Sequence, residues 1–149
     1  MAVVSVPPMT RAGARAAVRA GLRTAFPGTS QLAGTFNVNT LGTLKLDNSG
    51  TNANNRLGAN VAGTLNLQGG ELLITGNSGA TTTERVNTFN VLNGRGLITL
   101  AADPASQLNF TIGTLNGQNA TGAAVVRGIS STAGAGLATL TMSTAAFIT

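Results

Sequence analysis

Short phrases built on Gly-Thr-Leu recur through most of this chain from Gly34 onward. Within each phrase, apolar residues alternate with Thr, Asn, Lys or Gln, which is the period-two pattern of a strand with one buried face. Gly or Asn-Gly marks the turns between phrases. The chain is therefore predicted to be all-β and made of many short strands. The phrases are GTFNVNTL, GTLKLDN, GTLNLQG, GELLITG, NTFNVLNG, GLITL, QLNFTIG and GTLNG.

The strands recur at a loose interval, which predicts a solenoid. Apolar anchors such as Leu44, Leu65, Phe89 and Leu108 return about every twenty residues, the scale of one solenoid coil. We expect coils of two or three short strands around an aliphatic axis, each burying its apolar face on its neighbours. The predicted fold class is a right-handed parallel β-helix, or a closely related β-solenoid, with a short N-terminal amphipathic helix.

The composition argues against most enzyme chemistry. Only 9% of the 149 residues are charged, and His and Cys are absent. The commonest nucleophile–base pairs, thiolate metal sites and near-neutral proton shuttles are therefore not open to the chain. We predict no enzymatic activity, no cofactor and no metal site. The acidic residues, interpreted as turn formers and surface charges and not as a glycosidase pair, are Asp47, Glu71, Glu84 and Asp103.

The first part of the chain differs from the rest, which predicts an N-terminal arm over 1–28 and a solenoid domain over 29–149. The segment from Thr10 to Phe26 is rich in Ala and Arg, and a Pro-Gly pair follows it. Thr10 can cap a helix there, and the arginines recur every four positions as one basic stripe. We interpret this helix as a cap over the open end of the solenoid or as an arm that docks on a neighbour. The residues assigned to capping or assembly are Arg11, Arg15, Arg19 and Arg23, with Phe147 and Ile148 at the apolar C-terminus.

The net charge of +5 does not indicate a nucleic-acid partner. Four of the nine basic residues lie in the N-terminal stripe, which lacks the interleaved aromatic residues of a nucleic-acid surface. The rest of the chain is nearly neutral. We expect no nucleic-acid binding, no secretory signal in the usual order of basic, apolar and small residues, and no transmembrane segment.

Two stretches interrupt the strand pattern and are expected to be loops: Asp47 to Asn60, rich in Asn, Gly and Ser, and Gly76 to Glu84, with a run of Thr. Turn-forming residues of this kind fit excursions from a solenoid.

The phrases GTLKLDNSGTNANNRLG, GTLNLQGGELLITGN and ERVNTFNVLNGRGLITL resemble the autotransporter-associated β-strand repeat found in passenger domains of bacterial surface proteins. The resemblance spans roughly Gly34 to Gly117. The segment Arg56-Leu57-Gly58 occupies the place of the Leu-Gly step that follows an Asn-rich loop in that family. The resemblance implies a right-handed parallel β-helix exported to the cell surface.

These features predict a structural, non-catalytic, extracellular β-solenoid module of a bacterial surface or adhesin-type protein. Its polar ladders would bind a glycan or an abiotic surface through repeated weak contacts. The main alternative is a self-assembling filament or virion subunit, a homo-oligomer joined through its N-terminal arm. A third is a carbohydrate-active enzyme on the same β-helix fold. The ladder residues are Thr43, Thr64, Asn66, Asn90 and Thr111.

Overall fold

The computed structural model describes residues 3–5, 17–18, 23–25, 34–58, 63–117, 122–128 and 136–146, with side chains described between 34 and 143. All elements in these ranges are strands, and all strand pairs between them are parallel. The predicted all-β class is therefore confirmed. The strands are β1 (Val3–Ser5), β2 (Ala17–Val18), β3 (Arg23–Ala25), β4 (Thr35–Asn39), β5 (Thr43–Asp47), β6 (Thr64–Gln68), β7 (Glu71–Thr75), β8 (Thr82–Val91), β9 (Gly94–Ala101), β10 (Leu108–Gly117), β11 (Gly122–Gly128) and β12 (Ala138–Ala146).

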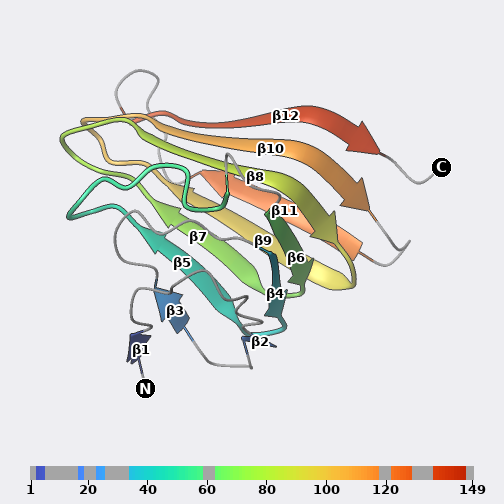
Figure 1. Cartoon of the computed structure of the whole chain (residues 1–149). Coiled ribbons are helices and arrows are strands. Elements are labelled where there is room, and N and C mark those ends of the chain that lie inside the picture. Colours follow the sequence, from blue (N-terminus) through green and yellow to red (C-terminus); the bar gives the residue numbers. More distant parts are fainter. Residues whose placement is uncertain are drawn as a thin grey trace.

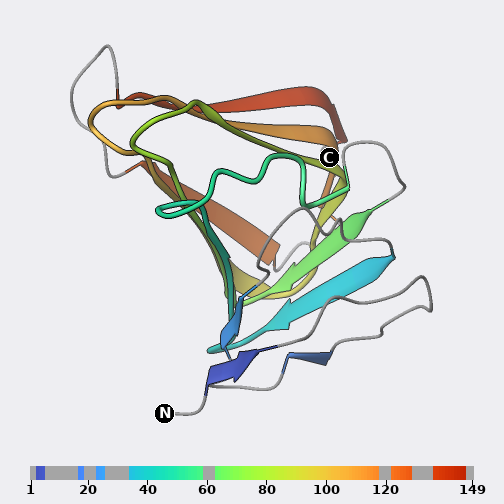
Figure 2. The same cartoon turned by 60° about the vertical axis from the view of Figure 1, so that its left-hand side comes forward.

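The strands alternate between two parallel sheets. The first sheet has the order β1-β3-β5-β7-β9-β11, and the second has the order β12-β10-β8-β6-β4-β2. Each strand therefore pairs with the strands two before and two after it, and the backbone winds as a solenoid in which each turn adds one strand to each sheet. In Figures 1 and 2 the strands stack from β1 at one end to β12 at the other.

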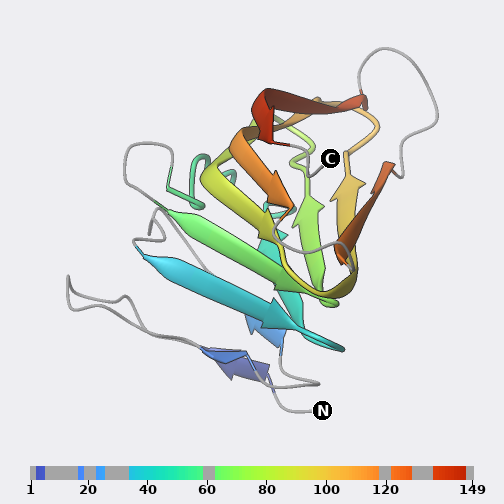
Figure 3. The ribbon, with the colours of Figure 1, turned by 90° about the vertical axis from the view of Figure 1, so that its right-hand side faces the viewer.

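Two long strands, β8 and β10, bend around a corner and add a third side to the coil (Figure 3). Their first halves, 82–86 and 108–112, pair with each other, and 108–112 also pairs with the start of β12. The second half of β8, 88–91, pairs with β6. In the coil that contains β4 and β5, the loop 48–58 takes the place of a strand on this side. Its Asn55 N–H donates to the carbonyl of Thr83 in β8 at 2.9 Å.

The core is an aliphatic column inside the coil, as expected from the alternating pattern. In β4 to β7 every second residue is buried. These inward side chains stack on one another, as Leu44 does on Leu72 and Leu72 on Ile98. Each such side chain contributes about 1.5–3 kcal/mol of hydrophobic stabilisation. Since a single coil has no second layer of its own, this burial requires stacked neighbours.

The expected interval of about twenty residues holds only for the first turns, where Val3 pairs with Arg23 and Arg23 pairs with Thr43. The later turns are longer: they take between 24 residues, from Leu65 to its partner Phe89, and 30 residues, from Leu108 to its partner Ala138. The anchors seemed closer because they lie on different sides of the coil. Leu44 belongs to the first sheet, Leu65 and Phe89 to the second, and Leu108 to the third side.

The two expected loops are present but slightly shorter. The first begins after Asp47, which ends β5, and the second ends before Thr82, which begins β8. Near the first loop's end, Asn55 and Gly58 have positive φ values of 60° and 90°. This left-handed pair turns the chain at the step where the sequence places Arg56-Leu57-Gly58.

The expected N-terminal helix lies mostly outside the described residues. Within its range, the structure describes only β2 and β3, and β3 pairs in register with the start of β5.

Candidate binding face

The second sheet carries the same three-residue motif, Thr-x-Asn, on four consecutive strands of the described structure. The motif falls in β4, β6, β8 and β10, and its residues are aligned directly across the sheet. Since successive residues of a strand point to opposite faces, the Thr and Asn of each motif point outward together, although Asn90 is only 8% exposed. We call this surface the Thr–Asn face. Its residues are Thr35, Asn37, Thr64, Asn66, Thr88, Asn90, Thr114 and Asn116.

The asparagines of the Thr–Asn face form one continuous chain of amide hydrogen bonds. Asn66 donates its Nδ2 to Oδ1 of Asn37 at 2.7 Å, and Asn90 donates to Asn66 at 2.7 Å. Asn116 donates to Asn90 at 3.0 Å. Every bond runs in the same direction along the solenoid axis, an arrangement in which neighbouring bonds polarise each other. The chain fixes the orientation of the amides.

The middle residue of each motif points inward and anchors the face. Phe36, Leu65 and Phe89 are at most 5% exposed and stack directly on one another, and Leu115 continues the column against the core. Close packing of this kind permits little rotamer freedom. The outward side chains are therefore carried on a backbone held from beneath.

The three sides of the solenoid differ in charge. No described outward side chain of β4 or β6 is charged, and none in the second halves of β8 and β10, which pair beside them, is charged either. The third side presents Arg85, and the first sheet presents Lys45, Asp47, Glu71, Arg95 and Arg127. The Thr–Asn face is thus a neutral polar surface on a chain whose other sides carry charges.

The predicted ladder residues fall on all three sides. Thr64, Asn66 and Asn90 belong to the Thr–Asn face, whereas Thr43 lies in the first sheet and Thr111 lies on the third side. The sequence argument missed the remaining members of the face. The repeated phrase Thr-x-Asn would have found them, because it occurs once in each of four successive coils.

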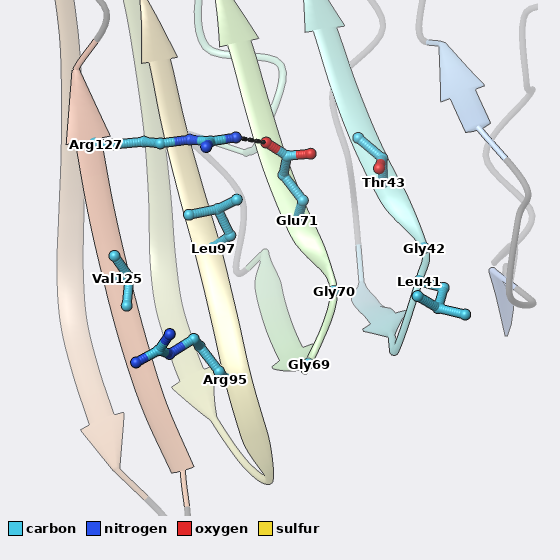
Figure 4. A pocket seen from close by; sticks show the side chains of 10 residues that line it. All are labelled: Leu41, Gly42, Thr43, Gly69, Gly70, Glu71, Arg95, Leu97, Val125 and Arg127. Carbon is cyan, nitrogen blue, oxygen red and sulfur yellow. Dashed lines mark hydrogen bonds and ion pairs between the residues drawn. The ribbon is translucent and has the colours of Figure 1, made fainter.

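A shallow groove of about 440 Å³ lies on the outer surface of the first sheet (Figure 4). Thr99 donates its hydroxyl to Oε1 of Glu71 at 2.6 Å, and the Arg127 Nε donates to the same hydroxyl at 2.9 Å. The Nη2 of Arg127 lies 3.4 Å from Glu71 Oε1. Glu71 is therefore occupied by a cross-strand network, which is an ordinary way of placing opposite charges on a sheet.

Two of the remaining carboxylates are turn formers, as expected. Asp47 accepts the N–H of Ser49 at 3.0 Å and pairs with Lys45 at 2.6 Å, and Asp103 accepts the N–H of Ala105 at 2.9 Å. The hydrogen bond from Lys45, followed by those from Ser49, lowers the pKa of Asp47 from 3.8 to about 2. Both aspartates therefore act locally in corner turns.

The interpretation of Glu84 as a surface charge was wrong, because its side chain is fully buried. It points into the core on the third side, where it pairs with the equally buried Arg56 at 3.0 Å between Nε and Oε1. The backbone N–H of Arg56 also donates to Glu84, at 2.7 Å, and the Arg56 Nη1 donates to the carbonyl of Asp47 at 3.3 Å. Burial raises the pKa of Glu84 above its ordinary 4.5, against the opposing effect of Arg56.

The residues assigned to capping or assembly cannot be placed. Arg11, Arg15, Arg19, Phe147 and Ile148 lie outside the described residues. Arg23 begins β3, aligned with Thr43 of β5, but its side chain is likewise outside the described part.

The described residues contain no group of three or more acidic, His or Cys side chains placed to hold a metal ion. Among them, no helix is long and apolar enough to cross a membrane. Comparisons with family models, curated proteins and solved structures found no match for this chain.

Proposed function

We propose that this chain is a structural, non-catalytic β-solenoid module of a bacterial surface protein, and that it works outside the cell by contact through its Thr–Asn face. The observation that carries the proposal is the alignment of one outward motif on four successive described strands. A motif repeated in register offers many weak contacts that act together. The resemblance to the autotransporter-associated repeat supports the extracellular location. It also supports a right-handed coil, the handedness that parallel strand crossovers generally have.

The proposal is tested by retention of the purified chain on insoluble surfaces such as crystalline cellulose, chitin, silica and ice, together with a panel of soluble glycans. We expect retention on an insoluble surface that persists at high salt, because screening weakens charged contacts and the face is neutral. Thr88→Lys should abolish it by placing a charge in the middle of the face. Arg85→Lys, in the same strand but on the third side, is the matched control.

Two results would count against this function. Retention that disappears as salt rises would assign binding to the charged first sheet instead. Hydrolysis of any glycan in the panel, lost on replacement of Glu71 by Gln, would favour the carbohydrate-active alternative.

A second candidate, an assembling subunit, is favoured by the last coil. Val126 and Met142 are 44% and 48% exposed, although their partners one coil earlier, Ile98 and Ile112, are at most 2% exposed. These inward positions have no described coil above them, and β11 and β12 are the last strands of their sheets. An apolar open end with unpaired strand edges can add further strands.

Light scattering and negative-stain microscopy distinguish the two candidates. Filaments or defined oligomers that disappear in a chain starting at Gly28, and in Met142→Glu, would establish an assembling subunit. A monomer in all three forms would leave the displayed module as the function.

A further inference from the structure

We infer that the Thr–Asn face binds crystalline water, that is, the surface of ice. The inference rests on the proposed role of this face and names its partner. It follows from four properties of the face: its two-dimensional repeat, its neutrality, its fixed geometry and the chemistry of its outward groups.

The face repeats in two directions at once. Across the sheet, one Thr and one Asn recur at each strand, about 4.8 Å apart. Along each strand, Thr and Asn are two residues apart, which is about 6.7 Å. The register is direct from Thr35 through Thr64 and Thr88 to Thr114. Such a grid favours a partner that is itself periodic in two dimensions over a soluble molecule or a single polymer chain.

The charge and hydrogen bonding of the face narrow the partner further. A neutral face neither attracts ions nor holds the tight hydration shell of an ammonium or carboxylate group. The Thr hydroxyls of the face make no hydrogen bond within the described residues, and a hydroxyl both donates and accepts. The matching partner is a neutral solid whose surface atoms also donate and accept hydrogen bonds. Crystalline water has these properties, and its oxygen rows repeat on the scale of strand spacing.

A crystalline polysaccharide is the nearest competitor, and the face lacks the groups that sugars usually stack on. The chain has no Trp or Tyr. On the second sheet, the described phenylalanines, Phe36, Phe89 and Phe110, point into the core and are at most 5% exposed. The outward groups at those strands are Thr methyls and hydroxyls and Asn amides. This set can order water at its surface but offers no aromatic platform for a sugar ring.

The fixed geometry of the face allows weak contacts to add. A surface contact normally costs about 0.5–1.5 kcal/mol for ordering each flexible side chain that makes it. Here the Asn amides are already held at 2.7–3.0 Å by one another, and the stacked column beneath holds the backbone. Since the ordering cost was met during folding, contacts from the four described strands can be made together.

The experiment measures partition of fluorescently labelled full-length protein into a slowly growing ice crystal, and the slowing of grain growth in frozen sucrose. Thr88→Tyr and Thr114→Tyr place a bulky ring on the face. Thr111→Tyr is the matched control, because Thr111 lies in β10 like Thr114 but on the third side. Circular dichroism and thermal melting show that each variant is folded.

We expect the wild-type chain and Thr111→Tyr to enter ice and to slow grain growth. The two face variants should need at least a tenfold higher concentration for the same effect. A folded wild-type chain that is excluded from ice, or a control as impaired as the face variants, would overturn the inference. Retention on cellulose or chitin but not on ice, lost in Thr88→Tyr, would overturn ice as the partner while leaving the proposed function intact. Retention on no surface at all would overturn both.

Discussion

The buried pair between Arg56 and Glu84 predicts an unequal cost of removing its two members. Glu84→Gln leaves the Arg56 guanidinium buried without its counter-charge, and arginine cannot give up its proton in a protein. Breaking a buried pair in this way costs about 3–5 kcal/mol of unfolding free energy. Arg56→Met leaves a carboxyl group that can instead take up a proton.

The free energy of protonating Glu84 sets an upper bound on the electrostatic destabilisation that Arg56→Met causes. Protonating a carboxyl group of ordinary pKa 4.5 at pH 7 costs at most about 3.4 kcal/mol, at 1.36 kcal/mol per pH unit. At pH 5 the same step costs at most about 0.7 kcal/mol. The destabilisation by Arg56→Met should therefore shrink by up to about 2.7 kcal/mol between pH 7 and pH 5. Glu84→Gln should change much less, because no titratable group remains in the pair.

Urea unfolding followed by circular dichroism at pH 5, 6 and 7 measures both costs. The double variant Arg56→Met with Glu84→Leu is the control, because replacing a whole buried pair by apolar side chains is often neutral or stabilising. The reasoning fails if Arg56→Met is as destabilising at pH 5 as at pH 7. It also fails if Glu84→Gln costs less than about 1 kcal/mol, which would mean that water reaches the guanidinium.

Three further predictions follow from single positions. Because its pKa is lowered, Asp47 stabilises the fold above pH 4, and this contribution is lost as pH falls towards 2. Asp47→Asn should therefore lose less stability below pH 4 than the wild type, by under about 1 kcal/mol for so exposed a pair. Acid titrations of both proteins, monitored by circular dichroism, measure this difference. Gly70→Ala should destabilise the fold, because a Cβ there would lie 2.5 Å from a backbone carbonyl oxygen, whereas Gly50→Ala has open space and should be tolerated; equal melting temperatures would contradict this. Phe89→Ala should cost about 3–5 kcal/mol, but Val126→Ala, in the open last coil, should cost under about 1 kcal/mol; urea unfolding compares them, and similar costs would mean that Val126 is covered in solution.

The strands could be predicted from the sequence because their signal is local. Alternation such as Leu65-Asn66-Leu67 specifies a strand and its buried face without reference to any other part of the chain. The assignment of strands to sides could not be predicted in the same way. It depends on coil length, and coil length depends on corner loops that follow no pattern, so Leu44 and Leu65 were placed in one series although they lie in different sheets.

The burial of Glu84 shows the same limit and also a missed signal. Its neighbour Arg85 offered a local partner, whereas the true partner, Arg56, lies 28 residues earlier in an Asn-rich loop. The alternation of Thr82, Glu84 and Val86 nonetheless placed the carboxylate on the same side as a core valine. A charged residue that falls on the buried side of a strand's alternating pattern predicts a buried ion pair.

The variable corner loops make this solenoid a natural scaffold for inserted sequences. Turns of 24 and 30 residues deliver their strands to the sheets in equally good register. Extra length is therefore absorbed at the corners, and loop-closure entropy rises only slowly with length. A peptide inserted beside the exposed Gly50 would project sideways from the corner without shifting any strand of the coil. Copies placed at successive corners would then be held in a row, spaced by the rise of one strand.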